Sequence, residues 1–189
     1  MRLRFFYFSH FSRFHFRNME LLIPGLLLVT LMVWASTRIK KTAAAAFELE
    51  MVETDDFTLE KPEGFLNKIN RDESLAFEAY SKDMGTGDAS EFRAARVELR
   101  AYDQRKLDYA TGAIRESTKV TSEITEVIDE RKYHIMEAET VEKGVGFREK
   151  YKLVEKDGRV FELKLIVLDE TNNEISRKID TIFNSFVLK

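Results

Sequence analysis

The chain has 189 residues, of which 44% are hydrophobic and 33% are charged, as in a globular protein with one core. These proportions exclude collagen-like, low-complexity and wholly disordered chains. The chain has no cysteine and three histidines, which excludes disulfide scaffolds, thiol nucleophiles, iron–sulfur clusters, the usual zinc fingers and the lipid-modified cysteine of bacterial lipoproteins.

The formal net charge is −3, but this charge is distributed unevenly along the chain. Residues 1–41 contain seven basic residues and one acidic residue, which leaves the remainder with 23 basic and 32 acidic residues. An acidic domain repels phosphate backbones, and here the basic residues alternate with acids instead of forming a stripe. We therefore expect no binding to nucleic acid.

The first 19 residues form a basic, aromatic segment. Four arginines and six phenylalanines precede the first acid, Glu20. This composition suits a mitochondrial presequence, and it equally suits an interfacial anchor at the level of the lipid headgroups. A third interpretation is that the protein starts at Met19, in which case residues 1–18 are not part of it.

An uncharged, mostly apolar run follows and extends from Leu21 to Thr37. Its 17 residues are at the short end of the range that spans a bilayer as a helix. A buried core helix would show polar positions at every turn, whereas Thr30 is the only polar residue between Leu21 and Trp34. The sequence therefore predicts a transmembrane anchor over residues 20–37, followed by a linker over residues 38–46.

Orientation and processing of this anchor are less well defined by the sequence. Arginines precede the apolar run and Arg38, Lys40 and Lys41 follow it, so the positive-inside rule favours an N-terminus inside only slightly. Small residues around Ala35 and Ala43–Ala46 could permit cleavage, but basic residues are unusual beside a cleavage site. We expect a single-pass membrane protein with an extracytoplasmic soluble domain; the alternatives are export after cleavage and an organellar membrane.

From residue 47 onward the dominant hydrophobic period is two, which is typical of strands with one dry face. Alternation predicts strands over 94–102, 133–141, 146–154 and 159–168, and Asp157-Gly158 suits a tight turn between the last two. Residues 133–169 therefore form a predicted three-stranded meander. Shorter strands are expected over 47–53, 57–61 and 75–81.

Two segments carry a helical pattern. Ile175, Ile179, Ile182, Phe183 and Phe186 form one apolar stripe, which we expect to pack on the sheet. Thr171 and Glu174 have the spacing of a capping box at the start of this helix. A second helix is expected over about 104–119, weakened by Gly112.

The order of these elements resembles that of PsbP-like domains. FTLEKPEGF at 57–65 is similar to their opening strand and Pro-x-Gly-aromatic turn, although Phe65 replaces the usual tryptophan. GRVFELKLIV at 158–167 and KIDTIFNSF at 178–186 are similar to their closing hairpin and final helix. The resemblance covers residues 47–188. It implies an α+β fold with an antiparallel sheet sandwiched by helices, in a family of extracytoplasmic accessory and binding proteins best known beside photosystem II, and it supplies no catalytic residue.

Catalytic and cofactor motifs are not found. His134 is the only histidine after residue 46 and lies in a predicted strand, without a Gly-x-Ser-x-Gly elbow. Gly85-Thr86-Gly87 and Gly144-Val145-Gly146 lack the remaining residues of a phosphate-binding loop, and we interpret them as loop or hairpin glycines. No catalytic residue, cofactor site or metal site is assigned.

The most suggestive polar group is a set of three glutamates. Alternation places Glu137 and Glu139 on one face of a strand, and we expect Glu149 on the same face of the next strand. Such carboxylates can share a metal or perform acid–base chemistry. The alternative is a solvated strand face neutralised by Arg148, Lys150 and Lys152.

Two functional hypotheses follow. The leading one is a membrane-anchored, non-enzymatic binding or assembly module that contacts another protein or a membrane complex. Its rival is a small-molecule or metal-binding protein, or an enzyme, that uses the acidic strand face of Glu137, Glu139 and Glu149.

Overall fold

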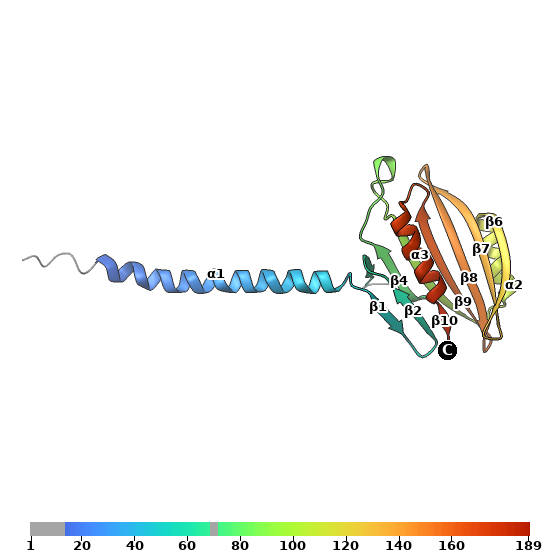
Figure 1. Ribbon diagram of the computed structural model, residues 1–189, viewed down its shortest axis with the longest axis horizontal. Coiled ribbons are helices and arrows are strands. Elements are labelled where there is room, and N and C mark those ends of the chain that lie inside the picture. Colours follow the sequence, from blue (N-terminus) through green and yellow to red (C-terminus); the bar gives the residue numbers. More distant parts are fainter. Residues whose placement is uncertain (1–13, 69–71) are drawn as a thin grey trace, which may run out of the picture. The chain divides into compact units, whose positions relative to one another are not determined.

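The structure of the protein, a computed structural model, describes residues 14–68 and 72–189 (Figure 1). The chain divides into two compact units, the first ending at Ala45 and the second spanning Ala46–Lys189. We refer to the second unit as the body. Residues 1–13 of the basic N-terminal segment lie outside the described residues.

The described part of the first unit, residues 14–45, is one long helix, α1 (Phe14–Ala45). Within it, the 20 residues Ile23–Thr42 have a mean hydropathy of 1.3, none of them is buried, and they are long and apolar enough to cross a membrane. The predicted anchor over residues 20–37 lies inside α1. Residues 38–45, expected as part of a linker, continue the same helix, because alanine, which fills positions 43–45, has the highest helix propensity.

The body is built on an antiparallel sheet. Within the described residues, seven strands pair in the order β3–β4–β5–β9–β8–β7–β6. The strands are β3 (Phe65–Asn67), β4 (Leu75–Ser81), β5 (Ala95–Asp103), β6 (Lys119–Ile128), β7 (Arg131–Glu142), β8 (Val145–Lys156) and β9 (Arg159–Leu168). Strands β6 to β9 follow one another as a meander, whereas β5 reaches β9 across the intervening helix and three strands.

A smaller sheet and two helices complete the body. The smaller sheet, again within the described residues, has the order β1–β2–β10. Its strands are β1 (Glu50–Glu53), β2 (Phe57–Lys61) and β10 (Val187–Leu188), and the helices are α2 (Leu107–Ser117) and α3 (Asn173–Ser185). A short 3-10 helix, Gly87–Ala89, lies in the β4–β5 loop.

Both faces of the large sheet are covered in part, as Figure 1 shows. On one face, α3 and the smaller sheet pack against β9, β5 and β4 and enclose the main core, which includes Leu59, Phe161 and Phe183. On the other face, α2 packs beside β8 and encloses a second cluster around Met136 and Leu153. The predicted α+β architecture, an antiparallel sheet sandwiched by helices, is confirmed.

Most predicted elements are confirmed, with three additional strands and one correction. The three-residue strand β3 was not predicted. The strand β6 was not predicted, because nearly all its side chains are exposed and it therefore lacks an apolar alternation. The two-residue strand β10 was not predicted either. The predicted capping box at Thr171 and Glu174 is wrong: Asn172 is the N-cap of α3, and its side chain accepts a hydrogen bond from the amide of Ile175.

The hairpin turns of the meander have left-handed backbone conformations. Asp157 and Gly158 have φ angles of 53° and 74°, as expected for an Asp-Gly turn. The β6–β7 turn differs, because Asp129 and Glu130 adopt φ angles of 51° and 65° without any glycine.

This turn provides a test of backbone strain. Glu130→Gly should stabilise residues 46–189 by about 0.5–1 kcal/mol, because relief of the left-handed conformation exceeds the entropic cost of glycine. The control is Glu155→Gly, at an exposed position near the end of strand β8. This change should destabilise the same fragment by a similar amount. Urea denaturation of both variants measures the difference, and a destabilised Glu130→Gly variant would contradict the prediction.

Candidate functional site

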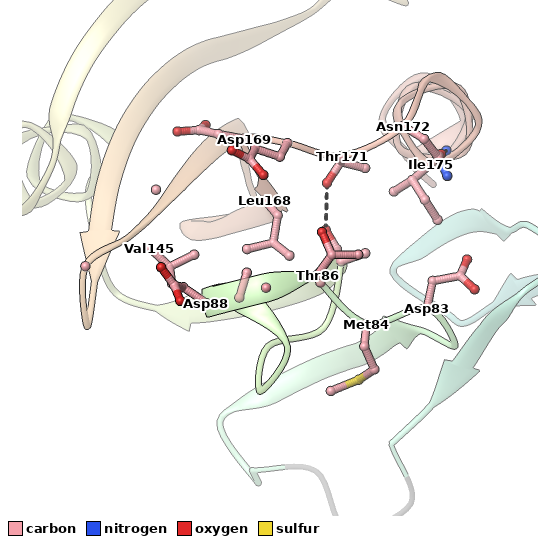
Figure 2. Close-up of a pocket in the computed structure, with 17 residues that line it drawn as sticks. Asp83, Met84, Thr86, Asp88, Val145, Leu168, Asp169, Thr171, Asn172 and Ile175 are labelled. Atoms are coloured by element: carbon pink, nitrogen blue, oxygen red, sulfur yellow. Dashed lines mark hydrogen bonds between the residues drawn. The ribbon is translucent and has the colours of Figure 1, made fainter.

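A cavity of about 530 Å³ lies at one end of the large sheet. Three segments that are distant in sequence form its wall: the β4–β5 loop, the β7–β8 turn with the start of β8, and the junction between β9 and α3 (Figure 2). Their contributions are residues 83–89, residues 144–146 and residues 168–172, together with Ala94 and Ile175.

Close backbone contacts hold the β4–β5 loop in place. The amide of Gly85 donates to the carbonyl of Phe92, and the amide of Ala94 donates to the carbonyl of Asp83. A Cβ on Gly85 would lie 2.5 Å from the carbonyl oxygen of Ala89, so only glycine fits here. The Thr171 hydroxyl donates to the carbonyl of Ala94 at 3.4 Å and thereby joins this loop to the start of α3 (Figure 2).

Both glycine pairs identified in the sequence line this cavity. Gly144 has a φ angle of 82° and forms the β7–β8 turn. Gly146 leaves room for the carboxylate of Asp169, which a Cβ at this position would contact. Their interpretation as loop and hairpin glycines is confirmed, and the tertiary structure adds that the two loops meet.

Four acidic residues line the cavity. Asp83, Asp88, Asp169 and Glu170 are exposed carboxylates. The nearest cation to Asp169 is Arg148, whose Nε lies 3.7 Å from Oδ1. Among residues 14–68 and 72–189, no group of three or more His, Asp or Glu side chains has an arrangement that could hold a metal ion.

The expected acidic face of Glu137, Glu139 and Glu149 is not formed. In the β7–β8 register, Glu137 lies opposite Lys150, and Ala138 lies opposite Glu149. Neighbours across an antiparallel pair share a face, so Glu149 lies on the opposite face from Glu137 and Glu139. The expectation that the three carboxylates share one face is wrong.

Glu137 and Glu139 instead lie on the α3 side, beside a groove of about 250 Å³. Lys150 Nζ lies 3.8 Å from Glu137 and 3.5 Å from Asp180 of α3. Lys119 Nζ lies 2.7 Å from Glu139. These two glutamates therefore belong to exposed ion pairs, in which each carboxylate has a basic partner.

Glu149 is buried on the α2 side of the sheet, with 6% of its side chain exposed. It accepts hydrogen bonds from the hydroxyls of Tyr151 and Thr140, and Lys164 Nζ lies 2.9 Å from it. Burial, together with the adjacent Glu149 carboxylate, raises the pKa of Tyr151 well above its usual range. Tyr151 is therefore a permanent hydrogen-bond donor, and this arrangement stabilises a carboxylate rather than presenting it to a substrate.

The arrangement of the body is similar to that of solved structures. It matches cyanobacterial PsbP (CyanoP) from Synechocystis sp. PCC 6803 with a TM-score of 0.53 at 10% identity, over 76% of this chain and 94% of that one. It matches LpqN of Mycobacterium tuberculosis, described as involved in cell envelope biogenesis, with a TM-score of 0.54 at 12% identity, over 75% and 91% of the two chains. The fold is PsbP-like. The sequence matches no protein-family model and no curated protein.

The PsbP-like body contains a charge network that the sequence did not indicate. Four glutamates on the α2 side of the sheet are at most 7% exposed: Glu78, Glu98, Glu149 and Glu162. Lys68 lies 2.9 Å from Glu78, while Arg96 and Arg100 lie 2.9 Å and 3.1 Å from Glu98. In sequence these residues are indistinguishable from a solvated strand face, because the same alternation of charges describes both.

Glu162 gives this network a pH dependence. Burial raises its pKa, against the opposing effects of Arg100 and Lys164. The folded PsbP-like body therefore binds a proton at Glu162 more readily than the unfolded chain, in which the pKa of a glutamate is about 4.3. The stabilisation from this proton is complete below the unfolded pKa and is lost as the pH rises through the folded pKa.

Glu162→Gln should therefore gain stability relative to the parent as the pH rises from about 4 to 7, because glutamine carries no charge to bury. Urea denaturation of residues 46–189 at a series of pH values measures this difference. Glu142→Gln, at the exposed end of β7, is the matched control and should show no such trend. If the stability difference between Glu162→Gln and the parent did not change with pH, the pKa of Glu162 would be the same in the folded and unfolded chains.

Proposed function

We propose that the chain is a membrane-anchored, non-enzymatic binding or assembly module whose body acts by contact with another protein or membrane complex. The observation that carries this proposal is the exposure of apolar side chains along α1. Leu26, Leu28 and Leu31 are each more than half exposed, as are the other large apolar side chains from Ile23 to Ile39. A helix that is apolar on all sides and unburied by its own chain is stable in lipid.

The polar groups of α1 suit a membrane-spanning helix. The hydroxyls of Thr30, Thr37 and Thr42 each donate to the carbonyl four residues earlier, at 2.7–3.0 Å, so lipid leaves none of these donors unpaired. The Arg38 guanidinium lies 5.1 Å from the centre of the Trp34 ring. An arginine beside a tryptophan is typical of the boundary between hydrocarbon and headgroups.

The body supports a role in binding. Its PsbP-like fold agrees with the resemblance of residues 57–65 and 178–186, which implies extracytoplasmic accessory and binding proteins. The LpqN structure with the same fold is described as involved in cell envelope biogenesis. We infer for this chain a body outside the cytoplasm, held at a membrane by α1.

Extraction of membranes at alkaline pH tests the anchor. The full chain should remain in the membrane pellet. Leu28→Arg together with Leu31→Arg should release it, because each arginine near the centre of a spanning helix costs about 2.5–3.5 kcal/mol. Ala44→Arg together with Ala45→Arg, which adds the same charge outside the candidate span, is the matched control and should stay in the pellet. A parent chain that is released by alkaline extraction would contradict anchoring.

Purification after cross-linking in intact membranes tests the binding role. The full chain, solubilised in several mild detergents, should carry a stoichiometric protein partner. A chimera in which α1 is fused to an unrelated soluble domain is the control and should not carry this partner. Recovery of the bare protein from every detergent would argue against a binding or assembly role.

A further inference from the structure

The body is attached to α1 at a defined point. The buried Lys61, 2% exposed, donates from Nζ to the carbonyl of Ala46 at 3.0 Å and lies 3.1 Å from Glu50. The amide of Gly64 donates to the carbonyl of Phe47 at 2.7 Å. Ala46 and Phe47 are therefore held by hydrogen bonds to Lys61 and Gly64, shortly before strand β1 begins at Glu50.

Strand β1 and Leu49, the residue just before it, present apolar side chains to solvent beside this point. Leu49 is 62% exposed and Met51 is 57% exposed, whereas Val52 is paired with the buried Leu59 in register. Strand β1 is also an edge of the smaller sheet, with β2 as its partner in the described residues. Two adjacent apolar side chains on an exposed edge are unfavourable in water.

The covalent path limits how far this edge can lie from the candidate span. Three residues lie between Thr42, the last residue of the span, and Ala46, and even a fully extended chain covers only about 14 Å over these four steps. Leu49 follows three residues later. The chain itself thus holds the β1 edge within a short distance of the lipid surface.

The charges of β1 permit contact with headgroups. Glu50 is paired with Lys61, and Glu53 is paired with Lys189 at 2.8 Å, so these carboxylates carry counter-ions. The exposed residues Arg38, Lys40 and Lys41 lie at the end of the span and attract anionic lipid. A bilayer surface with some anionic lipid is therefore the occupant that matches this edge.

We propose that the β1 edge, through Leu49 and Met51, lies on the bilayer surface and thereby fixes the orientation of the body above the membrane. This inference rests on the proposed anchoring by α1. The short segment between Thr42 and Ala46 keeps the β1 edge at a high effective concentration next to the lipid. Burial of the Leu49 and Met51 side chains is therefore sufficient to hold the edge there.

The absence of cysteine from the chain allows a direct test. Single variants Leu49→Cys, Met51→Cys and Leu31→Cys of the full chain are spin-labelled in vesicles of phosphatidylcholine with a minor fraction of phosphatidylglycerol. Ala113→Cys is the control, exposed on α2 at the other face of the large sheet. Collision rates with oxygen, which partitions into lipid, and with a water-soluble nickel chelate report the surroundings of each label.

We expect the ratio of the oxygen collision rate to the nickel-chelate collision rate to be lipid-like at positions 31, 49 and 51. At these positions the ratio should be several-fold above that at position 113. A lipid-like label at position 31 with water-like labels at 49 and 51 would overturn the β1 contact and leave the anchoring intact. A water-like label at position 31 would overturn the anchoring, and the inference with it. Labels at 49 and 51 that are shielded from both reagents would show a protein on this edge and would also overturn the inference.

Discussion

Phe183→Ala should destabilise residues 46–189 by about 3–5 kcal/mol, through loss of burial and formation of a cavity. Phe183 is 5% exposed in the main core, between α3 and the sheet. The other members of its stripe, Ile175, Ile179, Ile182 and Phe186, are buried to a similar degree. The loss is comparable with the whole stability of a marginal domain, so α3 belongs to the core although it lies near the end of the sequence.

Chemical denaturation of the purified body measures this effect. The matched control is Arg177→Ala on the exposed side of the same helix, which should cost well under 1 kcal/mol. Equal stability of the Phe183→Ala variant and the parent would mean that α3 does not pack on the sheet in solution. The apolar stripe would then be free to bind a partner.

Lys164→Met should destabilise the body by about 2–4 kcal/mol, because it leaves Glu149 buried without its cation. This expected loss of stability is smaller than for a fully buried ion pair, because 23% of the Lys164 side chain is exposed. Methionine keeps the length and apolar stem of lysine, so the change tests the charge rather than the packing. Lys132→Met, at an exposed position of β7, is the control and should have little effect.

A double-mutant cycle with Glu149→Gln isolates the ion pair. Glu149→Gln removes the buried charge, so the double variant should be more stable than the sum of the single effects predicts, by about 1–3 kcal/mol. Additive effects would mean that Glu149 and Lys164 do not interact in solution, and that the buried position of Glu149 has another origin.

The position of Glu149 shows what limits inference from the sequence. The alternation within β8 places Glu149 on the face of Phe147 and Tyr151, and the alternation within β7 places Glu137 opposite to Met136. The two-residue turn Lys143-Gly144 sets Glu142 opposite Val145, and counting back from this turn gives the correct face. A register error of one residue moves every side chain to the other face, which is why the shared acidic face was expected.

The sequence by itself determined the elements whose signals are local. A long uncharged run defined the apolar helix, period-two alternation defined the meander β7–β9, Asp157-Gly158 defined a turn, and one apolar stripe defined α3. Each depends on neighbours along the chain, so composition and spacing suffice. The resemblance at residues 57–65 and 178–186 gave the correct fold for the same reason, because these motifs are short and contiguous.

Only the tertiary structure decided which distant segments meet. It pairs β5 with β9 and β10 with β2. It also brings the loops at Gly85 and Gly144 to one cavity, and it distinguishes the buried Glu149 and Glu162 from the exposed Glu137 and Glu139. A strand sequence specifies which side chains share a face, but burial depends on what packs against that face. In this protein α2, α3 and the smaller sheet supply that cover, and their placement is a property of the whole chain.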